Sequence, residues 1–407
     1  MFTKTILKST NRETGKPMHF KGRYVACLAA ALMVAGCGNI AASVTGGSDS
    51  QDSKSAPDPA SVISSTIADG AKSAPGSVVK ISASPGWSIA VVPSGTGNVT
   101  GAVNASGAWV SSPLPPSSSY LFTATASDPS SGQTVARNFS GSTSGSKNTL
   151  TAEITPSGGK YGVGIIPRVV FSDPVRKSDR AQLEKRMVVT SSHPVAGDWY
   201  WESDQTAAYR PLKSGPKQTF WPGNSSIAIN VDLVGAYAHG SGKDIAWGTR
   251  KYTRTIKTGR SMIIYVNAKT DQGYVTINGK KARSFGVSLG KPGFTSRSGI
   301  KTIMDTYRVK EMTNAGVTSE VYDLMVPYAM QITDTGEYFH GAPWNGNIGY
   351  SNSSHGCTNL EESDAAWFFS RVMYGDPLIT TGTSRRMEYN NGQGAAWNVP
   401  EKKWIKG

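Results

Sequence analysis

The chain contains very little cysteine, with three residues among 407. These are Cys27, Cys37 and Cys357, and so few thiols exclude a fold held together by a framework of disulfides. Charged residues make up only 17% of the sequence, which excludes a disordered polyelectrolyte and a long helical assembly. The net charge of +14 favours anionic surfaces, but the body of the chain has no recognition helix, RNA-binding signature or dense Lys/Arg run. We therefore expect no nucleic-acid partner.

Long hydrophobic runs are also missing, because none reaches the ~20 residues that a helix needs to span a bilayer. The longest run lies within YVACLAAALMVAGCGN and follows a basic segment, an order that is typical of an export signal. Its end, Val34 to Cys37, resembles a bacterial lipobox, which implies cleavage before Cys37 and a diacylglycerol on its sulfur. The sequence thus predicts a lipoprotein signal peptide at residues 1–36. A plain signal peptide or a membrane anchor is the alternative, and in each case the body lies outside the cytoplasm.

The next segment, residues 37–76, is rich in Ser, Ala, Asp, Gly and Pro and predicts a flexible linker. Two blocks follow, residues 77–147 and 148–254, in which short strand-like pieces alternate with turn residues, a pattern typical of β-sandwiches. The clearest strand is SSIAINVDL, whose apolar residues occupy every second position. The tryptophans of the second block are either sandwich core, the more frequent case, or a platform for glycans, and they are Trp199, Trp201, Trp221 and Trp247.

A third block, residues 255–382, is predicted to be mostly β. Asn278-Gly279 between two strand-like runs indicates a hairpin turn. After the last cysteine, acidic residues followed by Ala366, Phe369 and Val372 at helical spacing predict one short helix. The tail, residues 383–407, carries two tryptophans among polar residues, and we expect it to pack on a neighbouring domain.

Cys357 is the one cysteine left in the exported body, within SNSSHGCTNL. A lone thiol in an oxidising exterior is either an inert core residue or a reactive nucleophile, and its polar neighbours favour the nucleophile. Sulfur attacks as the thiolate, and with a usual pKa of ~8.5 it needs a base to take its proton at pH 7. His340 and His355 both precede Cys357 in this block. His340 lies at the end of a predicted strand, and the loop after that strand leads back to Cys357.

The residues around Cys357 favour acyl transfer. Gly356 permits unusual torsions that let backbone N–H groups converge on an oxyanion. A zinc site of His340, His355 and Cys357 is an alternative, but it lacks a fourth ligand. A buried structural cysteine is the other alternative. We expect no metal and no organic cofactor.

His340-Gly-Ala-Pro-Trp, followed by Ser354-His355-Gly356-Cys357-Thr358-Asn359, resembles the signature of the L,D-transpeptidases of the YkuD/ErfK type. The resemblance runs from about residue 258 to the C-terminus and includes GDPLITTG and WNVPEKKW. The lipid-anchored start and the two sandwich blocks are similar to the mycobacterial-type members. The resemblance implies a mainly β fold, with two immunoglobulin-like β-sandwiches followed by a YkuD-type β-rich catalytic domain with one short helix.

The resemblance also implies roles for individual residues. Cys357 is the nucleophile and His340 the general base and later acid. Gly341 would orient the imidazole through its backbone carbonyl, and Ser354, His355 and Gly356 would form the loop that supplies the oxyanion amides. Tyr322 and Asn359 would bind the substrate. Two segments depart from the family pattern: Thr295 to Gly299 replaces a Thr-Pro-x-Gly turn, and the lid region 301–325 is not closely similar.

The activity that the resemblance implies is the formation of 3→3 crosslinks between peptidoglycan stem peptides through a cysteine thioester, with release of D-alanine from tetrapeptide stems. It further implies inhibition by carbapenem-type β-lactams and a place on the outer face of the cytoplasmic membrane, facing the cell wall. Three alternatives stay open: an L,D-carboxypeptidase that uses the same thioester, attachment of a protein or D-amino acid to the wall, and a non-catalytic wall-binding lipoprotein.

Overall fold

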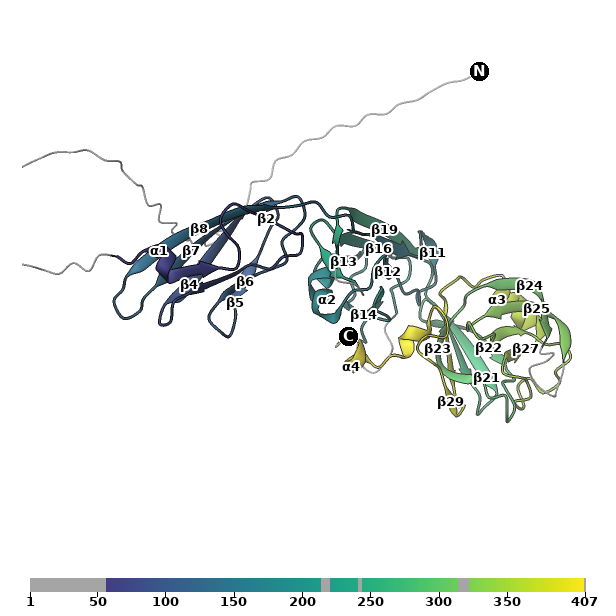
Figure 1. Ribbon diagram of the computed structural model, residues 1–407. Coiled ribbons are helices and arrows are strands. Elements are labelled where there is room, and N and C mark those ends of the chain that lie inside the picture. Colours follow the sequence, from purple (N-terminus) through teal and green to yellow (C-terminus); the bar gives the residue numbers. More distant parts are fainter. Residues whose placement is uncertain (1–55, 214–219, 241–243, 314–321, 406–407) are drawn as a thin grey trace, which may run out of the picture. The chain divides into compact units, whose positions relative to one another are not determined.

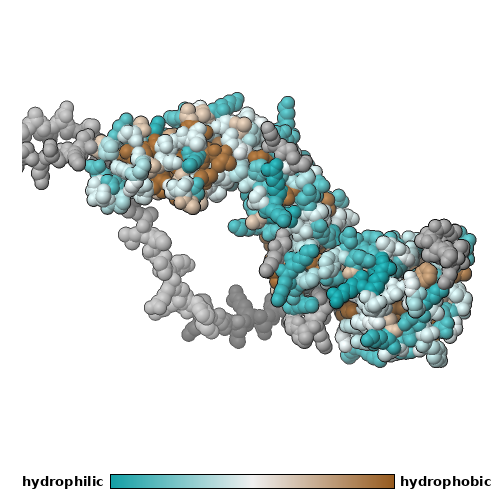
Figure 2. Space-filling view, turned by 60° about the horizontal axis from the view of Figure 1, so that its bottom comes forward, coloured by the Kyte–Doolittle hydropathy of each residue, from teal (hydrophilic) through white to brown (hydrophobic). Residues whose placement is uncertain are grey.

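The computed structural model describes residues 56–213, 220–240, 244–313 and 322–405, and the predicted signal peptide with Cys37 lies outside them. The described part is mostly β (Figure 1). None of its helices is both long enough and apolar enough to cross a bilayer. On the face drawn in Figure 2, hydrophilic and near-neutral residues predominate, and the hydrophobic residues form separate patches.

Two four-stranded sheets form the first sandwich, in the orders β1-β3-β6-β5 and β2-β8-β7-β4. Its elements are α1 Pro59–Val62, β1 Ile63–Ser65, β2 Ala71–Ser73, β3 Lys80–Ala83, β4 Ser88–Gly95, β5 Gly101–Val103, β6 Trp109–Ser111, β7 Ser119–Ser127 and β8 Thr134–Thr143. Every second residue of β7 is buried, and Phe122 packs on Trp109 with ring centroids 5.2 Å apart. Period-2 burial of this kind is what a strand with one core face requires.

The predicted linker, residues 37–76, is too long at its C-terminal end. The helix α1 and the strands β1 and β2 all fall inside it, and Ile63 is completely buried in the first sandwich. The physical reason is that β1, whose sequence Ile-Ser-Ser has a single apolar residue, is held as a strand by the pairing of its backbone with β3.

The second sandwich has sheets in the orders β10-β12-β15-β14 and β11-β19-β16-β13, with a small third sheet, β17-β18-β9. Its elements are β9 Thr149–Leu150, β10 Ala152–Thr155, β11 Gly159–Tyr161, β12 Arg168–Phe171, α2 Lys177–Glu184, β13 Met187–Ser191, β14 Gly197–Trp201, β15 Thr206–Pro211, β16 Ser226–Asp232, β17 Tyr237–His239, β18 Ile245–Gly248 and β19 Lys251–Thr258. The alternation predicted for SSIAINVDL is confirmed, since Ile227, Ile229 and Val231 are buried in β16.

Three findings in the second sandwich differ from the sequence-based expectations or decide between them. The helix α2 was not expected. The boundary placed between residues 254 and 255 falls inside β19, which pairs with β16 as far as Lys257. All four tryptophans of this block are at least 93% buried, so they are interior residues and form no exposed platform for glycans.

The third domain has two sheets, in the orders β22-β21-β20-β28-β23-β29 and β24-β25-β26-β27. Its elements are β20 Met262–Asn267, β21 Gln272–Ile277, β22 Lys280–Gly286, β23 Arg297–Thr302, β24 Thr306–Thr313, β25 Asp323–Gln331, β26 Tyr338–Gly341, β27 Thr358–Leu360, α3 Glu362–Phe369, β28 Pro377–Thr381 and β29 Arg385–Arg386. The hairpin at Asn278-Gly279 is confirmed, with φ of 50° and 79° at the two residues.

The single helix predicted for this domain is α3, and its Phe368 packs against Phe285 and Phe339, with centroids 4.9 Å away in both cases. The helix ends at Phe369, before Val372, and it does not follow the cysteine directly. The strand β27 lies between Cys357 and α3 and pairs in parallel with β26. This pairing brings His340, in β26, level with Asn359, in β27.

The tail after β29 packs against the core of the second sandwich. It contains the 3₁₀ helix η1 Ala395–Asn398 and the short helix α4 Glu401–Trp404. The guanidinium of the buried Arg210 donates to Ala396 O and Val399 O, both over 2.8 Å, and lies 4.0 Å from the centroid of the Trp404 ring. The Trp404 indole in turn donates to Asp198 O, in the second sandwich.

Candidate active site

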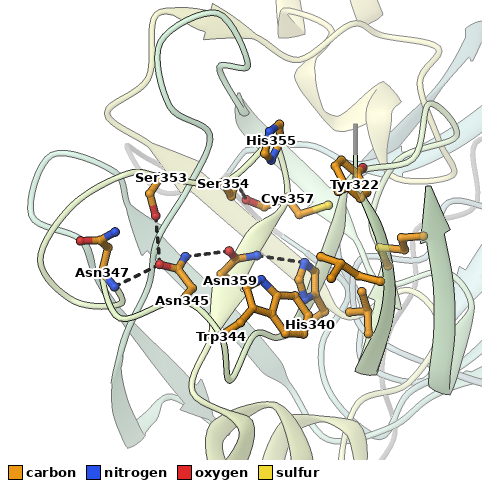
Figure 3. A pocket seen from close by; sticks show the side chains of 13 residues that line it. Tyr322, His340, Trp344, Asn345, Asn347, Ser353, Ser354, His355, Cys357 and Asn359 are labelled. Carbon is orange, nitrogen blue, oxygen red and sulfur yellow. Dashed lines mark hydrogen bonds between the residues drawn. The ribbon is translucent and has the colours of Figure 1, made fainter. Parts of the chain in front are cut away.

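Cys357 and His340 line the same cavity, which has a volume of about 350 Å³ (Figure 3). Its walls are formed by Met312, Tyr322, Leu324, Val326, His340, Trp344, Asn345, Asn347, Ser353, Ser354, His355, Cys357 and Asn359. His340 comes from the end of β26, and Cys357 directly precedes β27. Because these strands are neighbours in one sheet, the sheet itself brings the thiol and the imidazole to one opening.

The His340 ring is held by hydrogen bonds at both nitrogens. Nδ1 donates to the backbone oxygen of Gly341 over 2.8 Å, and the side-chain amide of Asn359 donates to Nε2 over 2.9 Å. The ring is therefore in the Nδ1–H form, and its basic site is the Nε2 lone pair, which accepts from Asn359. Burial lowers the pKa of His340 to about 4, so the imidazole is neutral at pH 7.

The hydrogen bonds of the described residues do not join the Cys357 thiol to this imidazole in the resting structure. Sγ makes a long, 3.9 Å contact with Gly336 O, and its side chain points toward Tyr322 in Figure 3. Burial raises the pKa of Cys357 to about 12, although the Tyr338 backbone N–H faces the sulfur and opposes this shift. The resting site thus holds a neutral thiol beside a neutral base, and no ion pair has formed.

A buried charge cluster lies beyond the sulfur. Lys301 is fully buried, and its Nζ is 3.2 Å from Glu337 Oε2, while Arg297 Nη1 donates to Glu337 Oε1 over 2.8 Å. Glu337 raises the pKa of Cys357, and Lys301 lowers it by a smaller amount. The cluster therefore holds Glu337 in place directly before β26 and does not favour the thiolate.

The loop before Cys357 is tied by its own hydrogen bonds. Ser354 Oγ donates to Cys357 O over 2.6 Å and accepts from Gly356 N over 3.1 Å. Ser296 Oγ donates to Gly356 O, also over 2.6 Å. The N–H of Gly356, which the sequence suggests as an oxyanion donor, is thus engaged by Ser354 in this structure. Ser296, within the segment that departs from the family pattern, was not predicted to act at the site.

Two further predicted residues, His355 and Tyr322, also line the cavity. The His355 ring packs edge-on against Phe294, with centroids 4.8 Å apart, and lies 5.1 Å from the Tyr322 ring. Burial raises the pKa of Tyr322, with a smaller contribution from Cys357. Both side chains line the cavity, as do those of His340, Ser354, Cys357 and Asn359, while Gly341 and Gly356 adjoin His340 and Cys357 along the chain.

Replacing Gly356 with alanine is expected to slow acylation of Cys357 by about tenfold, because its φ of 118° costs an L-residue ~1–3 kcal/mol. A Cβ here would have room, since the nearest heavy atom is Phe294 O at 3.5 Å, so the effect comes from backbone torsion. The measurement is the acylation rate of the purified protein. Gly240→Ala, at a second-sandwich position with open space around its Cβ, is the matched control. Equal rates for the two variants would contradict the torsional argument.

Sequence reasoning missed the residues that surround His340 on its outer side. Trp344 is 47% exposed, and its ring lies 6.3 Å from the imidazole at a 28° angle. Asn345 donates to Asn359 Oδ1 over 2.9 Å and accepts from Ser353 Oγ over 3.0 Å. The only sequence signal for them was their position directly after the HGAP stretch, which contains the base.

Comparison with known proteins gives two family matches along the chain. Residues 261–380 match the L,D-transpeptidase catalytic domain, and residues 71–237 match a bacterial Ig domain. The first match contains Cys357 and His340. The second covers the first sandwich from β2 onward and most of the second sandwich, in agreement with the mainly β architecture.

The chain is also similar to individual proteins. L,D-transpeptidase 1 of Mycobacterium tuberculosis is 27% identical over 237 residues, which is 57% of this chain and 84% of the relative. A solved structure of an L,D-transpeptidase in complex with imipenem is 26% identical and covers 58% of this chain and 100% of its own, with a TM-score of 0.47. L,D-transpeptidase 3 of M. tuberculosis, solved with a faropenem-derived adduct, is 25% identical over 57% of this chain and 98% of its own, with a TM-score of 0.45.

Proposed function

Because this chain carries an L,D-transpeptidase catalytic domain behind bacterial Ig-like sandwiches, we propose that it forms 3→3 crosslinks in peptidoglycan through a thioester on Cys357. The observation that carries the proposal is the shared cavity, into which a lone thiol and a neutral, oriented imidazole both open. Its volume suits the end of a peptide stem.

In the first half-reaction, Cys357 Sγ attacks the carbonyl carbon between the third stem residue and the terminal D-alanine. Rotation of the side chain away from Gly336 would bring the thiol to His340 Nε2 in place of the Asn359 amide, and Nε2 takes the proton. Because burial disfavours both the thiolate and the imidazolium, we infer that the proton moves as the carbon–sulfur bond forms and not before it. The protonated His340 then gives this proton to the leaving nitrogen, D-alanine departs, and the thioester remains.

In the second half-reaction, the side-chain amine of another stem's third residue attacks the thioester carbonyl. His340 takes a proton from that amine, and the sulfur leaves as the thiol once His340 returns the proton to it. The new amide is the 3→3 crosslink, and Cys357 and His340 are restored. Water in place of the amine would give an L,D-carboxypeptidase by the same steps.

The location of the reaction also belongs to this proposal. Cleavage before Cys37 and lipidation of its sulfur would tether the chain to the outer face of the cytoplasmic membrane. The two sandwiches would then stand between the tether and the catalytic domain, which faces the cell wall. Mass spectrometry of the N-terminal peptide from a membrane fraction, with and without Cys37→Ser, tests the tether.

Intact-protein mass spectrometry with tetrapeptide stems and with a carbapenem tests the activity. We expect loss of D-alanine, a crosslinked dimer of stems, and a covalent carbapenem adduct, all of which are absent in Cys357→Ala. Loss of D-alanine without a dimer would assign hydrolysis in place of crosslinking. Failure of the wild-type protein to form any adduct would favour a non-catalytic wall-binding protein.

A further inference from the structure

The hydrogen bonds on the outer side of His340 form a chain whose direction is fixed at its far end. Asn345 Oδ1 accepts from the backbone N–H of Asn347 over 3.0 Å and from Ser353 Oγ over 3.0 Å. A backbone N–H can only donate, so the Asn345 side chain must present its oxygen on this side. Its Nδ2 is thereby directed to the other side, where it donates to Asn359 Oδ1 over 2.9 Å.

The orientation of Asn345 determines that of Asn359 and thereby which atom of Asn359 faces Nε2 of His340. Asn359 has its oxygen turned to Asn345, so its Nδ2 faces the imidazole and donates to Nε2 over 2.9 Å (Figure 3). An N–H donor at this position is compatible only with an unprotonated Nε2. The proton of the neutral ring is then on Nδ1, where Gly341 O accepts it.

We propose that Asn345 is a positioning residue that sets the tautomer of His340 through Asn359. It keeps the basic lone pair on Nε2, the nitrogen that faces the cavity. Asn345 is part-buried and touches neither the thiol nor the imidazole in any hydrogen bond of the described residues, so it acts only through Asn359. The proposal deepens the function proposed above, although the tautomer itself can be measured without any reaction.

The proposal makes Asn345→Asp the decisive variant. Aspartate keeps the acceptor for Asn347 N–H and Ser353 Oγ, so the turn of the loop is retained, but it replaces the Nδ2 donor with a second acceptor. Asn359 is then driven to turn its amide, donate to residue 345 and present its oxygen to His340. That oxygen favours a proton on Nε2, which removes the base from the cavity.

The first measurement is the rate of Cys357 acylation by a carbapenem in Asn345→Asp and Asn345→Ala, followed from pH 4 to pH 9. We expect a loss of roughly 100-fold at pH 7 in the aspartate variant, with the acid limb of the profile moved to higher pH, because the added carboxylate also favours the imidazolium. The alanine variant, which leaves Asn359 free to keep its orientation, should lose only about tenfold, without a shift of the acid limb.

A merely structural role for Asn345 predicts the opposite order, since aspartate preserves the loop contacts and alanine removes them. An aspartate variant as active as the wild type, or more active than the alanine variant, would therefore overturn the proposal. The double variant Asn345→Asp with Asn359→Ala adds a check. Once Asn359 is gone, the aspartate should have little further effect on the rate beyond that of Asn359→Ala.

The second measurement is ¹⁵N NMR of the imidazole in protein labelled at histidine, which requires no substrate. In the wild type the His340 Nδ1 signal should be that of a protonated nitrogen and the Nε2 signal that of an unprotonated one. The aspartate variant should show the reverse, or both nitrogens protonated. If this NMR result held while the wild type formed no carbapenem adduct, the proposed function would fail and the positioning role would stand. Unchanged nitrogen signals in the variant would refute the positioning role alone.

Discussion

Replacing His340 with glutamine is expected to slow acylation of Cys357 by roughly 10³-fold, because it removes the group that takes the thiol proton. Glutamine is similar in size to histidine and can retain polar contacts. The loss of acylation rate therefore measures the removal of the base and not the creation of a cavity. Burial raises the pKa of Cys357 to about 12, and thus very little thiolate exists at pH 7 without help. The measurement is the rate of carbapenem adduct formation in the variant and in the wild type.

The pH dependence distinguishes this explanation from simple misfolding. In the wild type the neutral imidazole is the active form, so the rate should fall as pH decreases through about 4, the lowered pKa of His340, and stay level above it. In His340→Gln only hydroxide can deprotonate the thiol, so the residual rate should rise about tenfold per pH unit through the neutral range. His193→Gln, at an exposed site in the second sandwich, should retain the wild-type profile. A pH-independent residual rate in the His340 variant would argue against general-base catalysis.

Replacing Arg210 with alanine is expected to reduce the stability of the second sandwich by roughly 2–4 kcal/mol. The change leaves Val399 O without its donor, at ~1–3 kcal/mol, and removes one of the two donors to Ala396 O, which still accepts from Val399 N–H. It also removes the cation from the Trp404 ring. Burial lowers the pKa of Arg210 to about 10, so the guanidinium is still charged at pH 7, and its contacts are those of an ion.

Differential scanning calorimetry gives the shift in melting temperature, and hydrogen exchange of residues 395–404 shows whether the tail has separated from the sandwich. Arg210→Lys is the matched control, since it keeps the charge near Trp404 but has one nitrogen in place of the planar fork whose Nη1 and Nη2 reach the two carbonyls. We expect the lysine variant to fall between alanine and the wild type. Unchanged protection of η1 and α4 in the alanine variant would show that Arg210 does not hold the tail.

The sequence was most informative where the pattern is local. Alternating apolar residues predicted β16, Asn-Gly predicted the hairpin between β21 and β22, and acidic residues before an apolar stripe predicted α3. The motif around Cys357 identified the thiol and its histidine because both lie in short, distinctive stretches. Each of these features depends on a few consecutive residues, which is the information that a single sequence carries.

Features that depend on distant partners were missed or misplaced. The strand β1 exists because β3 pairs with it, and nothing within Ile63–Ser65 itself distinguishes it from linker. Asn345 was overlooked because its function depends on facing Asn359, fourteen residues away, while a backbone N–H fixes its other side. The engagement of Gly356 N–H by Ser354 is likewise a matter of loop geometry that residue types do not specify.

The contacts of Arg210 with the tail can form only after the whole chain has been synthesised. The guanidinium and its two acceptors are 186 and 189 residues apart, and Trp404 reaches Asp198 across 206. Because synthesis proceeds from the N-terminus, all strands of the second sandwich are made well before η1 and α4, which pack on it. Closing contacts of such wide separation is slow. Throughout that interval Arg210, Tyr200 and Phe220 lack the contacts that the tail later supplies.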